Sequence, residues 1–548
     1  MRPFARLLLA LAVLVACEGS AEAPRSKRAT VRLDVLFTSD VHGHLGQESA
    51  TFLNPEFPPP LGGGAAAAGY IARARMASEA EGGHVLLFDS GDWFTGTPLG
   101  QNTRGTAVID YMNRQHYDAS AIGNHDFDQG RAVAESLARR AHFPILASNL
   151  YDSTTGRRVD WASDMTWFRV GDLRIAVIGY ITETTPEMAF EKNVAGLEFK
   201  RIIDVMPNDV AWARRSGADL VFVLLHEGLP WHGDIQAVYR EMLQREAAGT
   251  LKQRGMDAME LARAVPGVDA IFAGHTHQGY AAPWEDPVTH CLVFEPYANG
   301  SSLGHVTFSI DAATRQILSW DTHFDRGALL TLLQDEVEPD TTEERLLRLQ
   351  TTEAERGLEA TVGHTQVPLE TGPAESGLLG FVMADAFREG VGAEVAIQNT
   401  GGVRGRLRPG PITARDLLDV APFGNDMVML RMRGDLLRAI FEDKLRGRAG
   451  GLFVSGVRVR FDVSRPEGQR ILSIEVGGAP LDSTRDYTVA TTNYLAEGNS
   501  GLDRLRTLPA DAVVPAGFTD RDVLERYLRA HDPIHPVNDG RWQRVSAP

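Results

Sequence analysis

Between Leu33 and His277 the chain repeats one pattern: a short apolar run leads through a polar turn into a helix-like segment. The strand-like runs are Leu33–Phe37, Val85–Phe88, Ala119–Ile122, Ile145–Ala147, Arg174–Ile178, Leu220–Leu225 and Ala270–Phe272. Amphipathic segments rich in Ala and Arg separate several of them: Ala65–Ala80, Arg131–Arg140 and Asp257–Val265. Strands that alternate with helices predict an α/β domain. Such sheets place ligands just beyond their strand ends, which is where the polar turns fall.

A length of 548 residues is too great for one hydrophobic core, so more than one domain is expected. The charged stretch Thr341–Glu359 lacks Pro and predicts a helix between two domains. A second α/β pattern then begins with the helical segment Leu378–Arg388. The predicted division is a leader over 1–17, a linker over 18–30, a first domain over 31–335, a joining helix over 336–359 and a second domain over 360–548.

The N-terminus has the layout of an export signal. Arg2 and Arg6 precede the apolar run Leu7–Ala16, which is too short to span a bilayer. The tetrapeptide Leu14–Cys17 resembles a bacterial lipobox, in which the cysteine is acylated; an ordinary cleaved signal is the alternative. The prediction is therefore an exported protein in the periplasm or at the cell surface, with membrane contact only through a lipid anchor on Cys17. The other cysteine, Cys291, lies in an apolar stretch and predicts a buried thiol.

The formal net charge of −17 limits the class of ligand. Proteins that bind nucleic-acid polymers present basic surfaces, so a polymer of this kind is not the expected partner. A small phosphorylated ligand remains compatible, because a few metal ions or arginines invert the local field.

Five polar motifs follow the strand-like runs of the first domain. They are Asp40-Val41-His42, Gly91-Asp92, Gly123-Asn124-His125-Asp126, the lone His226 and Gly274-His275-Thr276-His277. Each alone is common, since Gly-Asp pairs favour turns and a histidine at a strand end can be a core residue. Their succession at strand ends predicts a metal centre.

The donors suffice for two divalent ions that share a carboxylate bridge. Asp92 is the predicted bridge. Asp40, His42 and His277 would complete one site, and Asn124, His226 and His275 the other. Mixed oxygen and imidazole ligands suit Zn, Mn, Fe or Co and do not choose among them.

These motifs resemble the signature of the calcineurin-like metallophosphoesterases. The pair Phe127-Asp128 after Gly-Asn-His is similar, more narrowly, to the 5'-nucleotidase family. The resemblance implies a four-layer fold, two sheets between helices, as the catalytic domain, and a separate C-terminal substrate domain. It also implies that His125 and Asp128 form a catalytic dyad that binds no metal. A water that bridges both ions would lose its proton and attack phosphorus, while His125 stabilises charge or protonates the leaving oxygen.

The second domain carries segments similar to the family's substrate loop and aromatic clamp. The expected substrate contacts are Asn399, Gly402, Arg404, Phe423, Tyr494 and Ser500. Arg404 would grip phosphate oxygens, and the Phe423 and Tyr494 rings would clamp a base.

Two departures from the family pattern affect these contacts. Ser500 stands where the family has a ribose-binding aspartate. The segment directly before Glu375, residues 370–374, also lacks the arginine that the family has there. Arg406, Arg408 or Arg415 could supply the missing positive charge.

The expected activity is hydrolysis of nucleoside phosphates by a monomeric, metal-dependent phosphoric ester hydrolase. Alternatives with the same metal site are a 2',3'-cyclic-nucleotide phosphodiesterase, a UDP-sugar hydrolase or a thiosulfohydrolase-like enzyme. A tethered nucleotide-binding protein without turnover is the non-enzymatic alternative.

Overall fold

A computed structural model describes residues 29–545, apart from 51, 55–56, 231–234, 252–254, 325–326 and 447–450. The predicted leader over 1–17, including Cys17, and all but the last two residues of the 18–30 linker lie outside the described residues. Within the described part of the chain, no helix combines the length and the apolar character that a bilayer crossing requires. Cys291 is buried, as expected.

The first domain is built on two sheets. One has the strand order β17-β16-β1-β4-β5-β6, with β18 paired to β16. Its strands are β1 (Thr30–Thr38), β4 (His84–Asp89), β5 (Ala119–Ala121), β6 (Ile145–Leu146), β16 (Ser302–Asp311), β17 (Ile317–Thr322) and β18 (Leu329–Thr331). The other has the order β14-β15-β13-β12-β10-β9. Its strands are β9 (Met165–Val170), β10 (Leu173–Ile181), β12 (Leu220–His226), β13 (Ala270–Ala273), β14 (Trp284–Glu285) and β15 (Leu292–Phe294).

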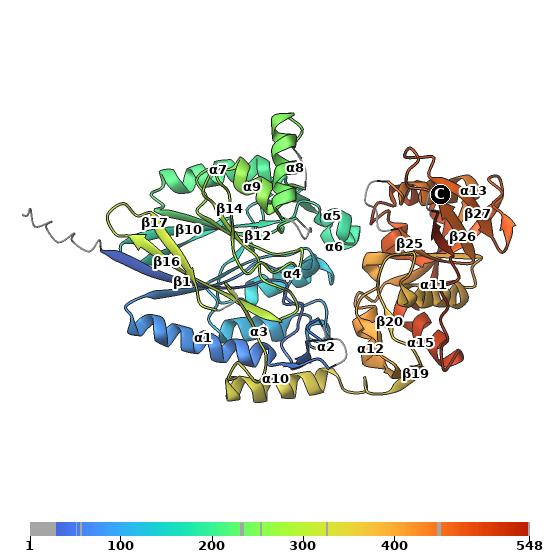
Figure 1. Ribbon diagram of the computed structural model, residues 1–548, viewed down its shortest axis with the longest axis horizontal. Coiled ribbons are helices and arrows are strands. Elements are labelled where there is room, and N and C mark those ends of the chain that lie inside the picture. Colours follow the sequence, from blue (N-terminus) through green and yellow to red (C-terminus); the bar gives the residue numbers. More distant parts are fainter. Residues whose placement is uncertain are drawn as a thin grey trace, which may run out of the picture.

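The two sheets face one another across a core rich in phenylalanine. Phe37 packs 5.2 Å from Phe272, and Phe222 packs 5.6 Å from Phe308, measured between ring centroids. Helices cover the outer faces: α1 (Gly63–Ala80) and α3 (Thr106–Arg114) lie below the sheets in Figure 1, and α7 (Ile202–Arg215) and α9 (Ala258–Ala264) lie above them. Helix α4 (Arg131–Arg140) packs in the same core cluster as α1 and α3. Helix, sheet, sheet and helix make the four layers that the family resemblance implied.

Shorter elements connect these layers. They are β2 (Glu48–Ser49), β3 (Pro60–Leu61), α2 (Pro98–Asn102), η1 (His125–Phe127), β7 (Leu150–Asp152), β8 (Arg157–Arg158), α5 (Thr185–Met188), α6 (Glu191–Val194), β11 (Leu197–Phe199) and α8 (Ile235–Ala247).

The Phe37 ring of β1 lies against the neighbouring strand β16 at a position that requires a glycine. Gly304 pairs with Phe37 of β1, and a Cβ atom at Gly304 would lie 2.1 Å from the Phe37 ring. Because cores tolerate little extra volume, we expect Gly304→Ala to lower the free energy of unfolding by about 1–3 kcal/mol. Gly46→Ala is the control, since a Cβ there would meet Thr351 at 3.4 Å, an ordinary contact. Urea unfolding of both variants measures the difference, and equal stability would contradict the packing argument.

The second domain is also mixed α/β. Its larger sheet has the order β25-β21-β29-β24-β30 and its smaller sheet the order β28-β27-β26-β31. The strands are β21 (Val395–Asn399), β24 (Asp426–Arg433), β25 (Leu452–Ser455), β26 (Val457–Phe461), β27 (Ile471–Val476), β28 (Ala479–Pro480), β29 (Asp486–Thr492), β30 (Val513–Thr519) and β31 (Trp542–Arg544). The helices are α11 (Leu378–Val391), α12 (Ala414–Val420), α13 (Gly434–Asp443), α14 (Asn493–Ala496) and α15 (Asp520–Ala530). Paired short strands β19 (Thr361–Thr365) with β23 (Gly410–Thr413), and β20 (Leu369–Glu370) with β22 (Arg406–Leu407), lie beside them.

Helix α10 (Thr341–Ala354) runs along the first domain toward the second (Figure 1). The Asp340 side chain caps it by accepting from the backbone nitrogens of Thr342 and Glu343. The helix ends five residues before the predicted Glu359, and Gly357 in the turn that follows has a φ of +86°. The domain boundaries inferred from the sequence stay a prediction.

Candidate active site

The predicted metal ligands lie on loops at the strand ends of both sheets. Asp40 follows β1, Asp92 follows β4, Asn124 follows β5, His226 ends β12, and His275 and His277 follow β13. Five of these loop residues adopt a left-handed backbone conformation. Their φ angles are +51° at Asp40, +51° at His42, +59° at Asp92, +74° at His275 and +59° at His277. Such conformations are costly for residues other than glycine and cluster at functional sites.

The first predicted ligand set converges on one point. Single donor atoms of Asp40, His42 and His277 all lie within 4.8 Å of one another. The Nε2 atoms of His42 and His277 are 3.0 Å apart, and the His277 Nε2 lies 3.5 Å from an Asp40 oxygen.

The second set forms the same arrangement. Donor atoms of Asp92, His226 and His275 also lie within 4.8 Å of one another. The Asn124 Oδ1 lies 3.1 Å from the His226 Nε2. Asp92 Oδ2 lies 3.1 Å from the Nε2 of His226 and 3.7 Å from that of His42. The carboxylate therefore stands between the two sets, the position expected of a shared ligand.

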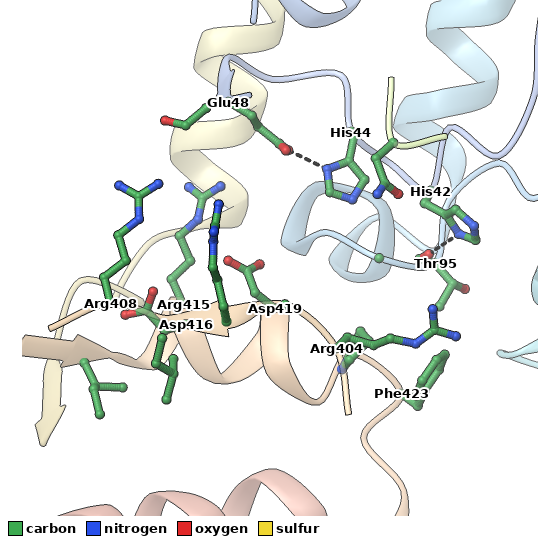
Figure 2. Close-up of a pocket in the computed structure, with 18 of the residues that line it drawn as sticks. His42, His44, Glu48, Thr95, Arg404, Arg408, Arg415, Asp416, Asp419 and Phe423 are labelled. Atoms are coloured by element: carbon green, nitrogen blue, oxygen red, sulfur yellow. Dashed lines mark hydrogen bonds and ion pairs between the residues drawn. The ribbon is translucent and has the colours of Figure 1, made fainter. Parts of the chain in front are cut away.

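Backbone carbonyls fix the tautomers of two of these histidines. The His42 Nδ1 donates to the Thr95 carbonyl at 2.7 Å (Figure 2), and the His226 Nδ1 donates to the Ser90 carbonyl at 2.7 Å. A carbonyl oxygen only accepts, so each Nδ1 carries a proton and each Nε2 turns to the centre. This arrangement fits a metal site, in which the outer ring nitrogen is held by a hydrogen bond.

Burial and charge set the protonation of the cluster. Burial lowers the pKa of His42 well below its ordinary value and that of His275 to about 3, which leaves both imidazoles neutral. Burial also lowers the pKa of His226, but the Asp92 carboxylate outweighs it and raises that pKa to about 10. An ion bound at His226 must therefore displace a proton.

The predicted dyad lies beside the metal ligands. The His125 Nδ1 is 2.9 Å from an Asp128 oxygen. Burial lowers the pKa of His125, but the charges of Asp128 and Asp92 outweigh burial and raise it to about 9. His125 is therefore protonated at neutral pH, with its Nε2 available as a donor.

Asp126, although inside a recognised motif, was not assigned a role from the sequence. Its carboxylate accepts from the backbone nitrogens of Asp92 at 3.1 Å, Trp93 at 2.8 Å and Gly123 at 2.8 Å. It ties the loops after β4 and β5 together. The sequence carries no signal for this role, because the burial of Asp126 is visible only in the structure.

The second domain brings four of its predicted substrate contacts close to the dyad or to one another. The Phe423 ring stacks on His125, with centroids 5.6 Å apart and planes 18° apart. The Arg404 guanidinium lies 5.5 Å from the Phe423 ring centroid. The Asn399 Nδ2 donates to the Ser500 Oγ at 3.0 Å. Gly402 leaves room for this loop, since a Cβ there would lie 2.4 Å from Gln398.

Phe423 and Tyr494, the two rings of the expected clamp, contact different rings of the first domain. Among the described residues, no ring contact joins Phe423 to Tyr494. Tyr494 packs instead at 90° against Phe190 of the first domain, with centroids 6.0 Å apart. Phe190 was missed from the sequence because its partner is distant in the chain.

A cavity of about 770 Å³ joins the two domains at this point (Figure 2). Its wall includes His42, His125 and His277 on one side and Arg404 and Phe423 on the other. The same wall carries the three further arginines noted in the sequence: Arg406, Arg408 and Arg415.

Comparison with known families decides the classification. Residues 33–279 match the family described as Calcineurin-like phosphoesterase, and residues 357–507 match the 5'-nucleotidase C-terminal domain. The chain belongs to the 5'-nucleotidase family. It is a metal-dependent phosphoric ester hydrolase that uses two divalent metal ions.

Relatives extend over nearly the whole chain. Protein UshA of Yersinia enterocolitica is 28% identical over 96% of both chains. The solved structure of a 5'-nucleotidase precursor from Thermus thermophilus is 25% identical, with a TM-score of 0.79, over 94% of this chain and 100% of that one. The sulfate thiohydrolase SoxB of Thermus thermophilus, solved with glycerol, is 21% identical with a TM-score of 0.73 over 94% and 97%. SoxB thus shares the fold with this 5'-nucleotidase family member.

Proposed function

We propose that this enzyme hydrolyses nucleoside 5'-phosphates. The observation that carries the proposal is the shared cavity, in which metal-site histidines and His125 face Arg404 and Phe423 of the other domain. A phosphate bound at the histidines would direct its nucleoside toward the second domain. There the Phe423 ring suits stacking of a base, and the Arg404 guanidinium suits a phosphate oxygen that points away from the histidines.

Each predicted metal ligand has a role in this proposal. Asp40, His42 and His277 would hold one ion, Asn124, His226 and His275 would hold the other, and Asp92 would be shared between them. When bound, the two ions lower the pKa of a water and stabilise charge on the phosphoryl oxygens.

The dyad completes the reaction. Asp128 orients His125 and keeps it cationic, and the His125 Nε2 donates a proton to the leaving oxygen. Arg404 binds the phosphate. Ser500, which accepts a hydrogen bond from Asn399, contacts the ribose in the position where the family has an aspartate.

The test is hydrolysis of 5'-AMP, ATP, UDP-glucose, 2',3'-cyclic AMP and p-nitrophenyl phosphate, with Mn, Co, Zn or Mg added. Products are separated by chromatography, because the first cleavage of UDP-glucose or of the cyclic nucleotide releases no inorganic phosphate. The proposal expects 5'-AMP to give the highest kcat/KM. A preference for UDP-glucose or the cyclic nucleotide would replace it with the corresponding alternative. Turnover of generic esters alone would overturn the nucleotide assignment, and no turnover with any metal would favour a binding protein.

Phe423 separates nucleoside binding from phosphate binding. Base–aromatic stacking contributes about 1–3 kcal/mol, so we expect Phe423→Ala to lower kcat/KM for 5'-AMP by about 5- to 150-fold. Glycerol 3-phosphate has no ring, and its kcat/KM should change much less. Trp320→Ala, on the half-exposed face of β17, is the control. Equal losses for both substrates would mean that Phe423 only supports His125.

Export and lipid attachment form a second part of the proposal. Cells that express the full chain should carry the activity in the membrane fraction, facing the periplasm or medium. Cys17→Ser should release it into the soluble fraction of that compartment. Activity that stays in the cytoplasm would contradict export, and an unchanged distribution in the variant would contradict acylation.

A further inference from the structure

A buried carboxylate lies among the loops that carry metal ligands. Strands β12, β13 and β15 are parallel neighbours in that order, so the loops that follow them lie on one edge of the sheet. Three predicted ligands belong to two of these loops: His226 to the β12 loop (226–229), and His275 and His277 to the β13 loop (274–280). Glu295 directly follows β15 and is 0% exposed. Because burial of a carboxylate is costly unless hydrogen bonds compensate it, its partners show what it stabilises.

The Glu295 side chain connects the β12 loop to the β13 loop. Its Oε2 accepts a hydrogen bond from the Leu229 backbone nitrogen at 2.7 Å, and its Oε1 accepts one from the Thr276 hydroxyl at 2.5 Å. Leu229 lies three residues after the ligand His226, and Thr276 stands between the two ligands of the β13 loop. One carboxylate therefore holds both loops, and each of its oxygens is occupied by one of them.

Two further features bring the loops close to this carboxylate. A Cβ atom at Gly228 would lie 2.6 Å from Glu295 Oε1 and 2.5 Å from Thr276 Oγ1, so the β12 loop approaches at a position that only glycine fits. The Glu295 backbone carbonyl accepts from the Tyr280 nitrogen at 3.0 Å. Thr276 and Tyr280 lie on either side of His277. The side chain and the backbone of Glu295 therefore hold the chain before and after this ligand.

We propose that Glu295 is a positioning residue that fixes the spacing between the β12 loop and the β13 loop, and thereby the ligands that these loops carry for the two ions. This role rests on the proposed function, in which those histidines bind metal. Asp126 has the same relation to the other sheet, because its carboxylate ties the loops after β4 and β5. Residues that orient metal ligands typically account for about 10- to 100-fold in metal affinity.

The effect of losing Glu295 should fall mainly on one of the two ions. The ion assigned to Asn124, His226 and His275 takes two of these three ligands from the loops that Glu295 holds. The other ion takes only His277 from them, and its two other unshared ligands follow β1. Without the carboxylate, the first of these ions should bind more weakly, and the second should stay close to its wild-type affinity.

Direct metal binding tests the role. Metal-free protein is dialysed against a series of Mn²⁺ concentrations, and bound metal per chain is measured by mass spectrometry. We expect two ions in the wild type. Glu295→Ala should bind one ion with the wild-type affinity and the other about 10- to 100-fold more weakly. Glu295→Gln should keep nearly the wild-type affinity for both, because its amide retains an oxygen for the Leu229 nitrogen and a donor for the Thr276 hydroxyl.

Two other variants separate positioning from general stability. Asp286→Ala is the matched control, because Asp286 follows β14 in the same sheet and is 0% exposed. Its carboxylate accepts from the backbone nitrogens of Val288 at 3.0 Å and Thr289 at 2.7 Å. This variant should lower the melting temperature of the metal-free protein, as Glu295→Ala does, but leave both Mn²⁺ affinities unchanged. Thr276→Val removes one of the two hydrogen bonds and should weaken the same ion by a smaller factor.

The outcomes distinguish this role from the metal centre itself. No bound metal in the wild type would overturn the assigned centre and the role of Glu295 with it. Two ions in the wild type, with the same affinities in Glu295→Ala, would overturn the role of Glu295 alone. Equal weakening in Glu295→Ala and Asp286→Ala would also overturn it, because general support of the fold would explain both. If Glu295→Ala does not fold, unchanged affinities in Thr276→Val would overturn the role.

Discussion

Replacing Asp92 by Asn is expected to lower kcat/KM for phosphate release by about a thousandfold. The carboxylate lies between the two ligand sets, 3.1 Å from the His226 Nε2 and 3.7 Å from the His42 Nε2. A neutral amide offers only one oxygen and no charge, so it cannot bridge two divalent ions. In the wild type, the second oxygen of the Asp92 carboxylate accepts a hydrogen bond from the His125 backbone nitrogen at 2.8 Å. The loop that carries the dyad should therefore also shift in the variant.

The measurement combines steady-state kinetics with metal analysis. Bound metal should fall together with activity in Asp92→Asn. Asp110→Asn is the control, because Asp110 forms a surface pair with Arg140. Activity within tenfold of the wild type, at unchanged metal content, would show that Asp92 is not the bridging ligand.

Replacing His125 by Ala is expected to lower kcat by about 10²- to 10⁴-fold while both ions stay bound. His125 contacts Asp128 and Phe423, and its predicted role is to protonate the leaving oxygen. A poor leaving group needs that proton more than a good one. The loss should therefore be larger for 5'-AMP than for p-nitrophenyl phosphate.

The pH profile provides an independent readout of the dyad. Because the pKa of His125 is about 9, kcat should be constant near neutral pH and fall as pH rises through about 9. Asp128→Asn removes the charge that raises this pKa, so the falling limb should move to lower pH. His116→Ala, an exposed histidine, should leave the profile unchanged. An unmoved limb in Asp128→Asn would exclude His125 as the titrating group.

The ligand positions could be predicted because they are local. Each ligand follows an apolar strand within a few residues, and strand ends of an α/β sheet converge on one edge. Asp92 was predicted as the bridge because two neighbouring divalent ions require a shared anionic ligand. The left-handed conformations of Asp40 and His42 carry no sequence signal, because no glycine marks those positions.

Contacts between distant segments could not be predicted in the same way. Phe423 stacks on His125 and Tyr494 packs on Phe190 because of how the two domains meet, which no local pattern encodes. The buried Asp34 of β1 likewise contacts His305 of β16 and His323, which directly follows β17, and both lie far along the chain. In sequence, Asp34 looks like an ordinary polar residue in an alternating strand.

The charged side chains around the cavity differ from the family pattern in the second domain. Ser500, the proposed partner of the sugar, is neutral and already accepts a hydrogen bond from Asn399. Arg415 is paired with Glu355, while Arg406 and Arg408 line the cavity on the same wall. We infer that these arginines replace the positive charge of the arginine that the family has before Glu375.

We infer that this centre hydrolyses a nucleoside phosphate when two ions are bound. Metal-free protein, prepared with a chelator, is titrated with Mn²⁺ while phosphate release from 5'-AMP is measured. We predict no phosphate release without metal. The rate should rise as Mn²⁺ fills both sites of the centre, and Asp92→Asn should show no such rise. Full activity in the metal-free protein, or none at saturating Mn²⁺, Co²⁺ or Zn²⁺, would contradict the claim.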